Sequence, residues 1–121
     1  MAKILFNEAT KEFHLQNDRI SYIFCIMENG QLGHQYFGKH LTHRDSFQHF
    51  IQMRTQSHTA YVYENDFLFT LDTIRQEYPS YGTTDFREPA YQIKQENGSR
   101  ITEFVYKNHE IYKGKKKLKG L

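Results

Sequence analysis

Histidines are concentrated in one part of this sequence. Five of the seven lie between residues 34 and 58, and the four that could form a metal site are His40, His43, His49 and His58. Zinc ligands must converge on one point, and they usually occur at paired spacings with each imidazole oriented by a neighbouring group. These histidines match none of the usual zinc spacings. We therefore interpret them as solvated loop residues, with one or two packed in strands, and expect no metal and no cofactor.

Acidic side chains are the second group that could do chemistry. Hydrolysis of a glycosidic bond needs two carboxyl groups that face each other across the sugar, one as acid and one as base or nucleophile. Glu77, Asp85 and Glu88 are close in the sequence, but their spacing does not show that any two converge. Fourteen acidic residues are ordinary in a chain of 121. We interpret these three as members of surface ion pairs and expect no catalytic residue.

Cys25 is the only cysteine, and it lies in an apolar run at residues 20–27. Apolar surroundings disfavour the thiolate, so we expect a buried thiol rather than a nucleophile. With no second cysteine the chain forms no internal disulfide, which favours a reducing compartment. No apolar stretch is long enough for a signal peptide or a membrane span. We expect a cytoplasmic protein without a membrane role.

Positive charge is concentrated in the last nine residues. The formal net charge is only +2, and the signs are mixed elsewhere, so the sequence lacks the broad basic surface that drives nucleic-acid binding. Five lysines crowd the end of the chain: Lys113, Lys115, Lys116, Lys117 and Lys119. Next to Tyr112 they could bind RNA or an anionic surface. We prefer a solvated connector and expect no nucleic-acid partner.

Strand patterns dominate from residue 12 onward. Residues 19–27 are apolar at nearly every position, which indicates a central strand buried on both faces. Asn29 and Gly30 follow, and Asn-Gly between two strand-like runs is typical of a hairpin with a type I′ turn. Residues 31–38 form the predicted return strand. The same Glu-Asn-Gly tripeptide at residues 96–98 predicts a second hairpin, between strands at 91–95 and 100–106.

Residues 42–54 break the strand pattern. Phe47, Phe50 and Ile51 have helical spacing, and Thr42 with Asp45 could form a weak capping pair, so we expect a short helix or an irregular loop. Further strands are predicted at 61–63 and 67–71, separated by a turn.

These elements predict a mainly β fold, an antiparallel β-sandwich with at most one short helix. We expect residues 1–121 to form a single unit. The last nine residues supply neither a closing strand nor a terminal helix, which indicates that the chain is part of a longer one.

The stretch QEYPSYGTTDFREPAY, residues 76–91, is expected to form an ordered connector. Pro79 and Gly82 bracket a turn, and the side chains of Thr84 and Asp85 can bond back to nearby amides. Arg87 can order the segment through charge-assisted hydrogen bonds to its acidic neighbours. The residues predicted to return the chain to the core are Phe86, Ala90 and Tyr91.

This connector resembles a segment of glycoside hydrolase family 36 α-galactosidases, mainly those of lactic-acid bacteria and related Firmicutes. Six other short segments resemble the family in the same order, so the resemblance covers nearly the whole chain. They are Phe-His-Leu at 13–15, Gly-Gln-Leu-Gly-His at 30–34, Tyr-Phe-Gly-Lys at 36–39, Leu-Asp-Thr at 71–73, Gln-Glu-Asn-Gly-Ser at 95–99 and Ile-Tyr-Lys-Gly-Lys at 111–115.

The resemblance implies a much longer enzyme. Family members have an amino-terminal β-supersandwich, a central (β/α)8 barrel with two catalytic aspartates, and a carboxy-terminal β-domain. The chain would be the first part of the supersandwich. The whole protein would hydrolyse terminal α-galactosides, such as raffinose and melibiose, with retention of configuration. Both catalytic carboxylates would lie outside this sequence, which alone should be inactive.

The resemblance also implies a homo-oligomer. Family members often form tetramers, in which a loop of the amino-terminal domain reaches the active site of a neighbouring subunit. The corresponding region here is roughly residues 50–66. Many relatives have an Arg-Leu-Asp-Arg-like run there, whereas this chain has Phe-Ile-Gln-Met-Arg and only Arg54 matches. We expect Arg54 either to line the neighbour's substrate rim or to be a solvent-facing loop residue.

Two other functions remain open on the sequence alone. The chain could be a free-standing β-sandwich that binds carbohydrate through exposed aromatic side chains, for which the candidates are Tyr61, Tyr63, Tyr78 and Tyr81. It could also be a structural or oligomerisation module that never touches sugar.

Overall fold

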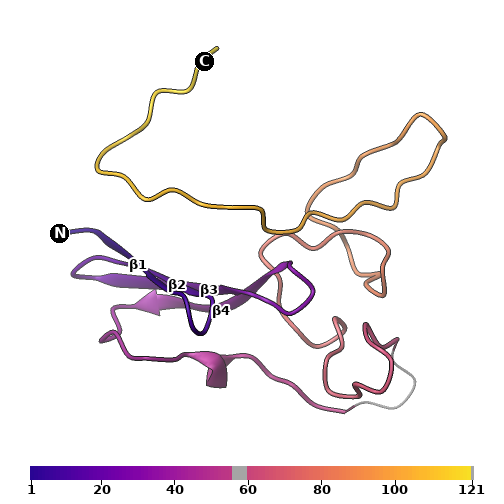
Figure 1. Ribbon diagram of the computed structural model, residues 1–121, viewed down its shortest axis with the longest axis horizontal. Helices are drawn as coiled ribbons and strands as arrows, with labels where there is room; N and C mark the ends of the chain where they lie inside the picture. The colour runs from indigo at the N-terminus through magenta and orange to yellow at the C-terminus, as the bar shows by residue number, and fades with distance from the viewer. Residues whose placement is uncertain (56–59, 121) are drawn as a thin grey trace.

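A computed structural model gives the structure of the protein and describes residues 1–55 and 60–120. Its regular part is a four-stranded antiparallel sheet in the order β1-β2-β3-β4 (Figure 1). The strands are β1 (Lys3–Asn7), β2 (Glu12–Gln16), β3 (Ile20–Ile26) and β4 (Leu32–Lys39). One three-residue 3-10 helix, η1 (Gln48–Phe50), follows. The mainly β, antiparallel fold with at most one short helix is confirmed.

The β3–β4 hairpin forms where Asn29 and Gly30 predict it. The amide of Met27 donates to the carbonyl of Gln31 over 2.8 Å, and the amide of Gly30 donates back to Met27 over 2.9 Å. Gly30 has a φ of 83°, whereas Asn29 keeps a negative φ. The connection is therefore a three-residue loop closed by a left-handed glycine, and the predicted type I′ turn is wrong.

Strand β1 had no counterpart among the predicted elements. Its residues pair with β2 from Lys3 opposite Gln16 to Asn7 opposite Glu12. The connecting turn is ordered by the Asn7 side chain, which accepts hydrogen bonds from the amides of Ala9 and Thr10. Strand β1 thus depends on pairing rather than on its own apolar pattern.

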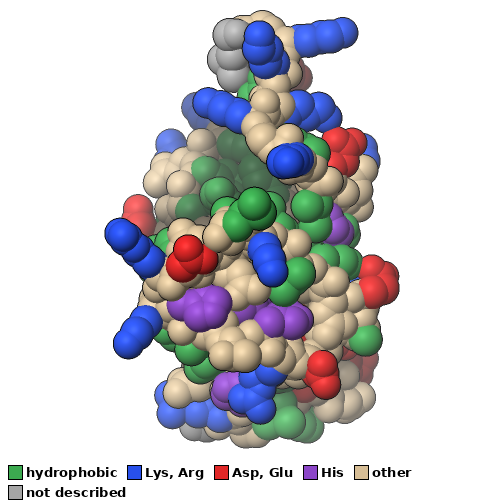
Figure 2. Space-filling model, turned by 90° about the vertical axis from the view of Figure 1, so that its left-hand side faces the viewer, with side chains coloured by type: hydrophobic (Ala, Val, Ile, Leu, Met, Phe, Trp, Pro, Cys, Tyr) green, Lys and Arg blue, Asp and Glu red, His purple; other side chains and the backbone are tan. Residues whose placement is uncertain are grey.

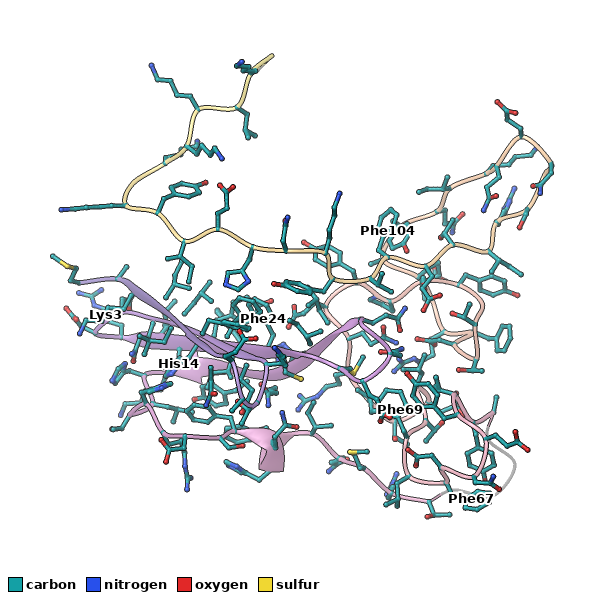
Figure 3. All side chains as sticks on the ribbon, in the orientation of Figure 1. Lys3, His14, Phe24, Phe67, Phe69 and Phe104 are labelled. Carbon is teal, nitrogen blue, oxygen red and sulfur yellow. The ribbon has the colours of Figure 1, made fainter. Side chains whose placement is uncertain are left out.

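The two faces of the sheet differ in character, as His14 and Phe24 on opposite faces illustrate (Figure 3). On the His14 face, the β3 residues Ser21, Ile23 and Cys25 are almost fully buried. On the other face, Phe24 stacks on Phe13 with ring centroids 4.8 Å apart and is half-buried. The expectation that β3 is buried on both faces is confirmed on one face and met only partly on the other.

The main core lies beside the hairpin end of β3, where residues from an irregular segment cover the sheet. Cys25 and Met27 pack there with Phe69, Leu71 and Ile74. The predicted strands at 61–63 and 67–71 are wrong, because neither segment joins a ladder. The turn between them forms, with Asn65 at a φ of 64°. Burial of apolar side chains, rather than strand pairing, holds this segment in place.

The predicted helix region, residues 42–54, contains only η1. Its cap position is Phe47, which makes no side-chain capping hydrogen bond, so the expected capping role of Thr42 and Asp45 is wrong. Phe47 is nevertheless buried against the sheet, and its ring meets that of His14 edge-on at 5.3 Å.

The second predicted hairpin forms its turn but not its strands. The amide of Gln95 donates to the carbonyl of Ser99 over 2.9 Å, and Gly98 has a φ of 84°. Tyr91 and Phe104 stack across the two arms at 4.5 Å, yet residues 91–106 form no regular ladder.

After this turn the chain runs extended along the sheet, toward the side where the amino terminus lies (Figure 1). His109 packs against Phe6 and Phe13 there, with ring centroids 4.5 and 4.7 Å apart. The lysine-rich end is exposed as expected for a connector. None of the described helices is long and apolar enough to cross a membrane.

Candidate functional site

Arg54 is exposed and lies on the irregular segment that follows η1. Part of the predicted 50–66 loop, residues 56–59 with His58, lies outside the described residues. A hollow of about 470 Å³ opens next to this segment, between η1 and residues 73–75. Its lining includes Phe50, Gln52 and Arg75. Arg54 is therefore at the surface of the part of the chain that the structure describes.

Of the four histidines of the metal-site hypothesis, the structure describes His40, His43 and His49, and His58 lies outside the described residues. Among the described residues, no group of three or more His, Cys, Asp or Glu side chains could hold a metal ion. His43 instead contacts His14, which the sequence did not single out, with their Nδ1 atoms 3.0 Å apart. Figure 2 shows several histidine side chains in the middle and lower part of the face turned to the viewer, with Lys or Arg side chains both above and below them.

His14 is part of a buried polar chain on the sheet face. Its Nε2 lies 2.9 Å from Oγ of Ser21, which also accepts a hydrogen bond from the amide of Leu41 at 2.9 Å. Burial lowers the pKa of His14 below its usual value, and the neighbouring His43 and His40 lower it further. These groups tie the segment after β4 to the sheet, which is a structural role.

Residues 76–91 form the ordered connector that the sequence predicted, and Asp85 is its centre. The carboxylate is almost fully buried and accepts two hydrogen bonds from the Arg87 guanidinium, both of 2.9 Å, and one of 2.8 Å from Gln76. The paired carboxylate raises the pKa of Arg87. The expected bond from Thr84 is wrong, because its hydroxyl has no partner among the described residues.

The connector is attached to the edge of the sheet. Gln76 bridges to Gly33 of β4, and the amide of His34 donates to the carbonyl of Arg75 over 2.8 Å. Glu77 lies 2.7 Å from Nδ1 of His34. This short extension of the sheet has no signal in the alternation pattern, because a single bridge needs no repeat.

Two of the three candidate carboxylates have structural partners. Asp85 is saturated by Arg87 and Gln76, and Glu77 pairs with His34. Glu88 is exposed beside them. The interpretation as ion-pair residues is confirmed for Asp85 and Glu77, although Asp85 is buried rather than on the surface.

Two apolar residues of the connector do not return to the core as predicted. Phe86 is 64% exposed, and Ala90 is exposed as well. Phe86 and Tyr81 meet edge-on at 5.6 Å and form one wall of a hollow of about 370 Å³. The sequence missed this aromatic corner because Phe86 has the residue type of a core position.

Cys25 is buried at the centre of the core, as expected. Burial raises the pKa of its thiol to about 12, with the Glu12 carboxylate contributing in the same direction. Such a thiol is protonated at neutral pH and is no nucleophile.

The sequence and the fold both match known glycosidases. The glycosyl hydrolase family 36 N-terminal domain matches residues 30–121. Alpha-galactosidase AgaA of Geobacillus stearothermophilus is 42% identical over 118 residues, which are 98% of this chain and 16% of the relative. Alpha-galactosidase Mel36A of Lactobacillus acidophilus is 33% identical, again over 98% of this chain and 16% of the relative. The chain therefore spans about a sixth of the length of these relatives.

Solved structures agree. The α-galactosidase of Lactobacillus brevis superposes with a TM-score of 0.86 at 41% identity, over 94% of this chain and 15% of that one. A variant of AgaA in complex with raffinose gives a TM-score of 0.78 at 43% identity, over 92% of this chain and 15% of that one. From the match of the domain and of the whole fold, the chain belongs to the amino-terminal domain of glycosyl hydrolase family 36.

Proposed function

We propose that residues 1–121 form a single non-catalytic unit at the amino end of a longer α-galactosidase, which hydrolyses terminal α-galactosides such as raffinose and melibiose. The observation that carries this proposal is that nearly the whole chain matches about a sixth of α-galactosidases. The buried and paired carboxylates described above offer no acid and base facing an open space. The chemistry then belongs to a barrel domain elsewhere in the polypeptide, with which this unit is in contact.

The activity of two polypeptides tests the proposal. We expect the polypeptide encoded by the complete reading frame to hydrolyse a nitrophenyl α-galactoside, and the purified 121-residue chain to release no product above a buffer blank. Sustained hydrolysis by the short chain, proportional to its concentration, would show that the catalytic groups lie within these residues. A complete reading frame that ends at residue 121 would exclude the barrel.

Assembly and location belong to the same proposal. We propose that the whole protein is a homo-oligomer, a tetramer, as the family resemblance implies, and that it works in the cytoplasm, which the single cysteine supports because it forms no internal disulfide. In this arrangement Arg54 projects from its exposed segment toward the substrate rim of a neighbouring subunit. A guanidinium offers up to five fixed donors, which suits the hydroxyl groups of a sugar.

Replacing Arg54 by alanine in the whole tetramer tests its role. Losing one charged donor to a substrate hydroxyl should raise KM for melibiose about tenfold. Arg44→Ala is a matched control, because Arg44 is an exposed arginine on the preceding segment. Steady-state kinetics and light scattering on both variants separate a lost sugar contact from a lost tetramer. Unchanged melibiose kinetics in Arg54→Ala would show that Arg54 makes no contact with the substrate and is a solvent-facing residue.

A free-standing carbohydrate-binding module is the second candidate function. Tyr78 and Tyr81 are exposed as this function requires, at 64% and 44%. Tyr63 packs on Phe69 at the edge of the core, and Tyr61 is half-buried. The prediction that these two side chains are exposed is therefore wrong. The exposed pair supports sugar binding only around residues 78–81.

A further inference from the structure

We infer that Asn97 is a site of spontaneous covalent modification, in which its side-chain amide becomes a carboxylate. The reaction is deamidation, and asparagine followed by glycine is its usual site, because glycine has no side chain to hinder attack by its amide nitrogen. This chain contains two such pairs in identical tripeptides, Glu-Asn-Gly at residues 28–30 and at residues 96–98. The structure selects the second pair. The inference does not depend on the hydrolytic activity proposed above.

The reaction consumes only water. The amide nitrogen of Gly98 bonds to Cγ of Asn97, the bond from Cγ to Nδ2 breaks, and the proton that Gly98 loses leaves with Nδ2 as ammonia. Water then opens the cyclic imide at one of its two carbonyl groups. Opening at Cγ gives aspartate, and opening at the main-chain carbonyl gives isoaspartate, in which the backbone runs through Cβ and Cγ. Either product places a second negative charge beside Glu96.

The two turns have the same local geometry. In each, the amide of the glycine donates over 2.9 Å to the carbonyl three residues before it, and φ of the glycine is left-handed, 83° at Gly30 and 84° at Gly98. The side-chain oxygen of each asparagine accepts a hydrogen bond from the amide two residues further on. Because a hydrogen-bonded glycine amide is not available to attack, each asparagine reacts only when its turn opens. The rates therefore depend on the free energy of opening each turn, which differs from place to place in a fold.

The first turn is held closed by its surroundings. It joins β3 to β4, whose ladder begins directly beside it. Nδ2 of Asn29 donates over 2.8 Å to the side chain of Gln31, which is 2% exposed. The carbonyl of Gly30 accepts a hydrogen bond of 2.7 Å from the amide of Tyr106. Opening this turn breaks these bonds and disturbs the hairpin that carries the core, so it is costly.

The second turn lacks this support. Its arms, residues 91–95 and 100–106, form no regular ladder, and Asn97 and Gly98 are both exposed. Among the described residues, Asn97 makes its side-chain hydrogen bond through its oxygen, and Nδ2 has no acceptor. No described atom outside the adjacent residues lies within 4 Å of the position that a Cβ on Gly98 would occupy. The loop projects away from the sheet (Figure 1). Opening it costs little, so Asn97 reacts first.

Peptide mapping by mass spectrometry tests the inference on the 121-residue chain. Incubation at mildly alkaline pH favours loss of the glycine amide proton. Aspartate and isoaspartate should form at position 97 at least about tenfold faster than at position 29, because the first turn must break more contacts to open. Asn108 is a second control, since it is exposed like Asn97 but is followed by His109, whose side chain hinders the attack. Asn108 should stay intact while Asn97 reacts.

Hydrogen exchange at the two glycine amides tests the physical reason. The Gly98 amide should exchange faster than the Gly30 amide by a similar factor, although both donate over 2.9 Å. The same order of reaction, Asn97 before Asn29, is expected in the longer polypeptide. Equal rates at Asn97 and Asn29 in either polypeptide would overturn the inference. A Gly98 amide that exchanges as slowly as that of Gly30 would overturn it as well.

Discussion

Replacing Asp85 by alanine is expected to lower the free energy of unfolding by about 2–3 kcal/mol. The carboxylate is almost fully buried and accepts hydrogen bonds from Gln76, from the Arg87 amide and twice from the Arg87 guanidinium. Its loss leaves a cationic group and an amide without their acceptors. Arg87 is 38% exposed, so water satisfies part of its guanidinium, and the effect stays below that of a fully buried ion pair.

Urea unfolding followed by circular dichroism measures this effect. Asp45→Ala is the matched control, since Asp45 is an exposed aspartate on the segment after β4, and it should change stability by less than about 0.5 kcal/mol. Combining Asp85→Ala with Arg87→Ala should cost less than the sum of the single changes, because the two residues interact directly. Equal stability of Asp85→Ala and the parent chain would show that the Asp85 carboxylate does not stabilise the connector.

Stability should fall as the pH decreases below about 6.5, the ordinary pKa of histidine. His14 has a lowered pKa when the chain is folded, chiefly through burial and also through His43 and His40. The unfolded chain therefore takes up a proton at a pH where the folded chain does not, and each decrease in pH favours unfolding until the folded pKa is reached. Two imidazoles with Nδ1 atoms 3.0 Å apart also cannot both carry a proton there without losing their hydrogen bond.

Unfolding free energies at pH 7.5 and pH 5 measure this dependence. His14→Phe should flatten it, because the titrating group is removed, and His43→Gln should reduce it. His49→Gln is the control, since His49 is exposed and contacts the ring of Phe50 rather than His14. If His14→Phe keeps the full pH dependence of the parent, another group is responsible.

Local signals in the sequence predicted the hairpin of β3 and β4 well, whereas they missed β1. The apolar run at residues 19–27 and the Glu-Asn-Gly turn after it define β3, the hairpin and β4, because neighbouring strands joined by a short loop need only local pairing. The resemblance likewise identified the family from short segments spread along the chain. The type of turn was not predictable from Asn-Gly alone, since a three-residue loop uses the same glycine.

The second half shows where local signals were insufficient. Residues 67–71 have strand-forming composition, yet Phe69 and Leu71 are buried without joining a ladder. Residues 91–95 and 100–106 keep their turn and stack Tyr91 on Phe104, but do not pair regularly. A strand needs a partner at the right distance as well as a pattern, and that partner is a property of the whole fold.

The residues at the candidate sites divide in the same way. Sequence alone determined the family, the buried and inert Cys25, and the charge-ordered connector, because residue type and neighbouring positions decide these features. Only the tertiary structure decided that His43 meets His14, that Asp85 is buried, and that Phe86 faces outward beside Tyr81. These outcomes depend on which surfaces distant segments cover, and covering is set by packing in three dimensions rather than by the pattern along the chain.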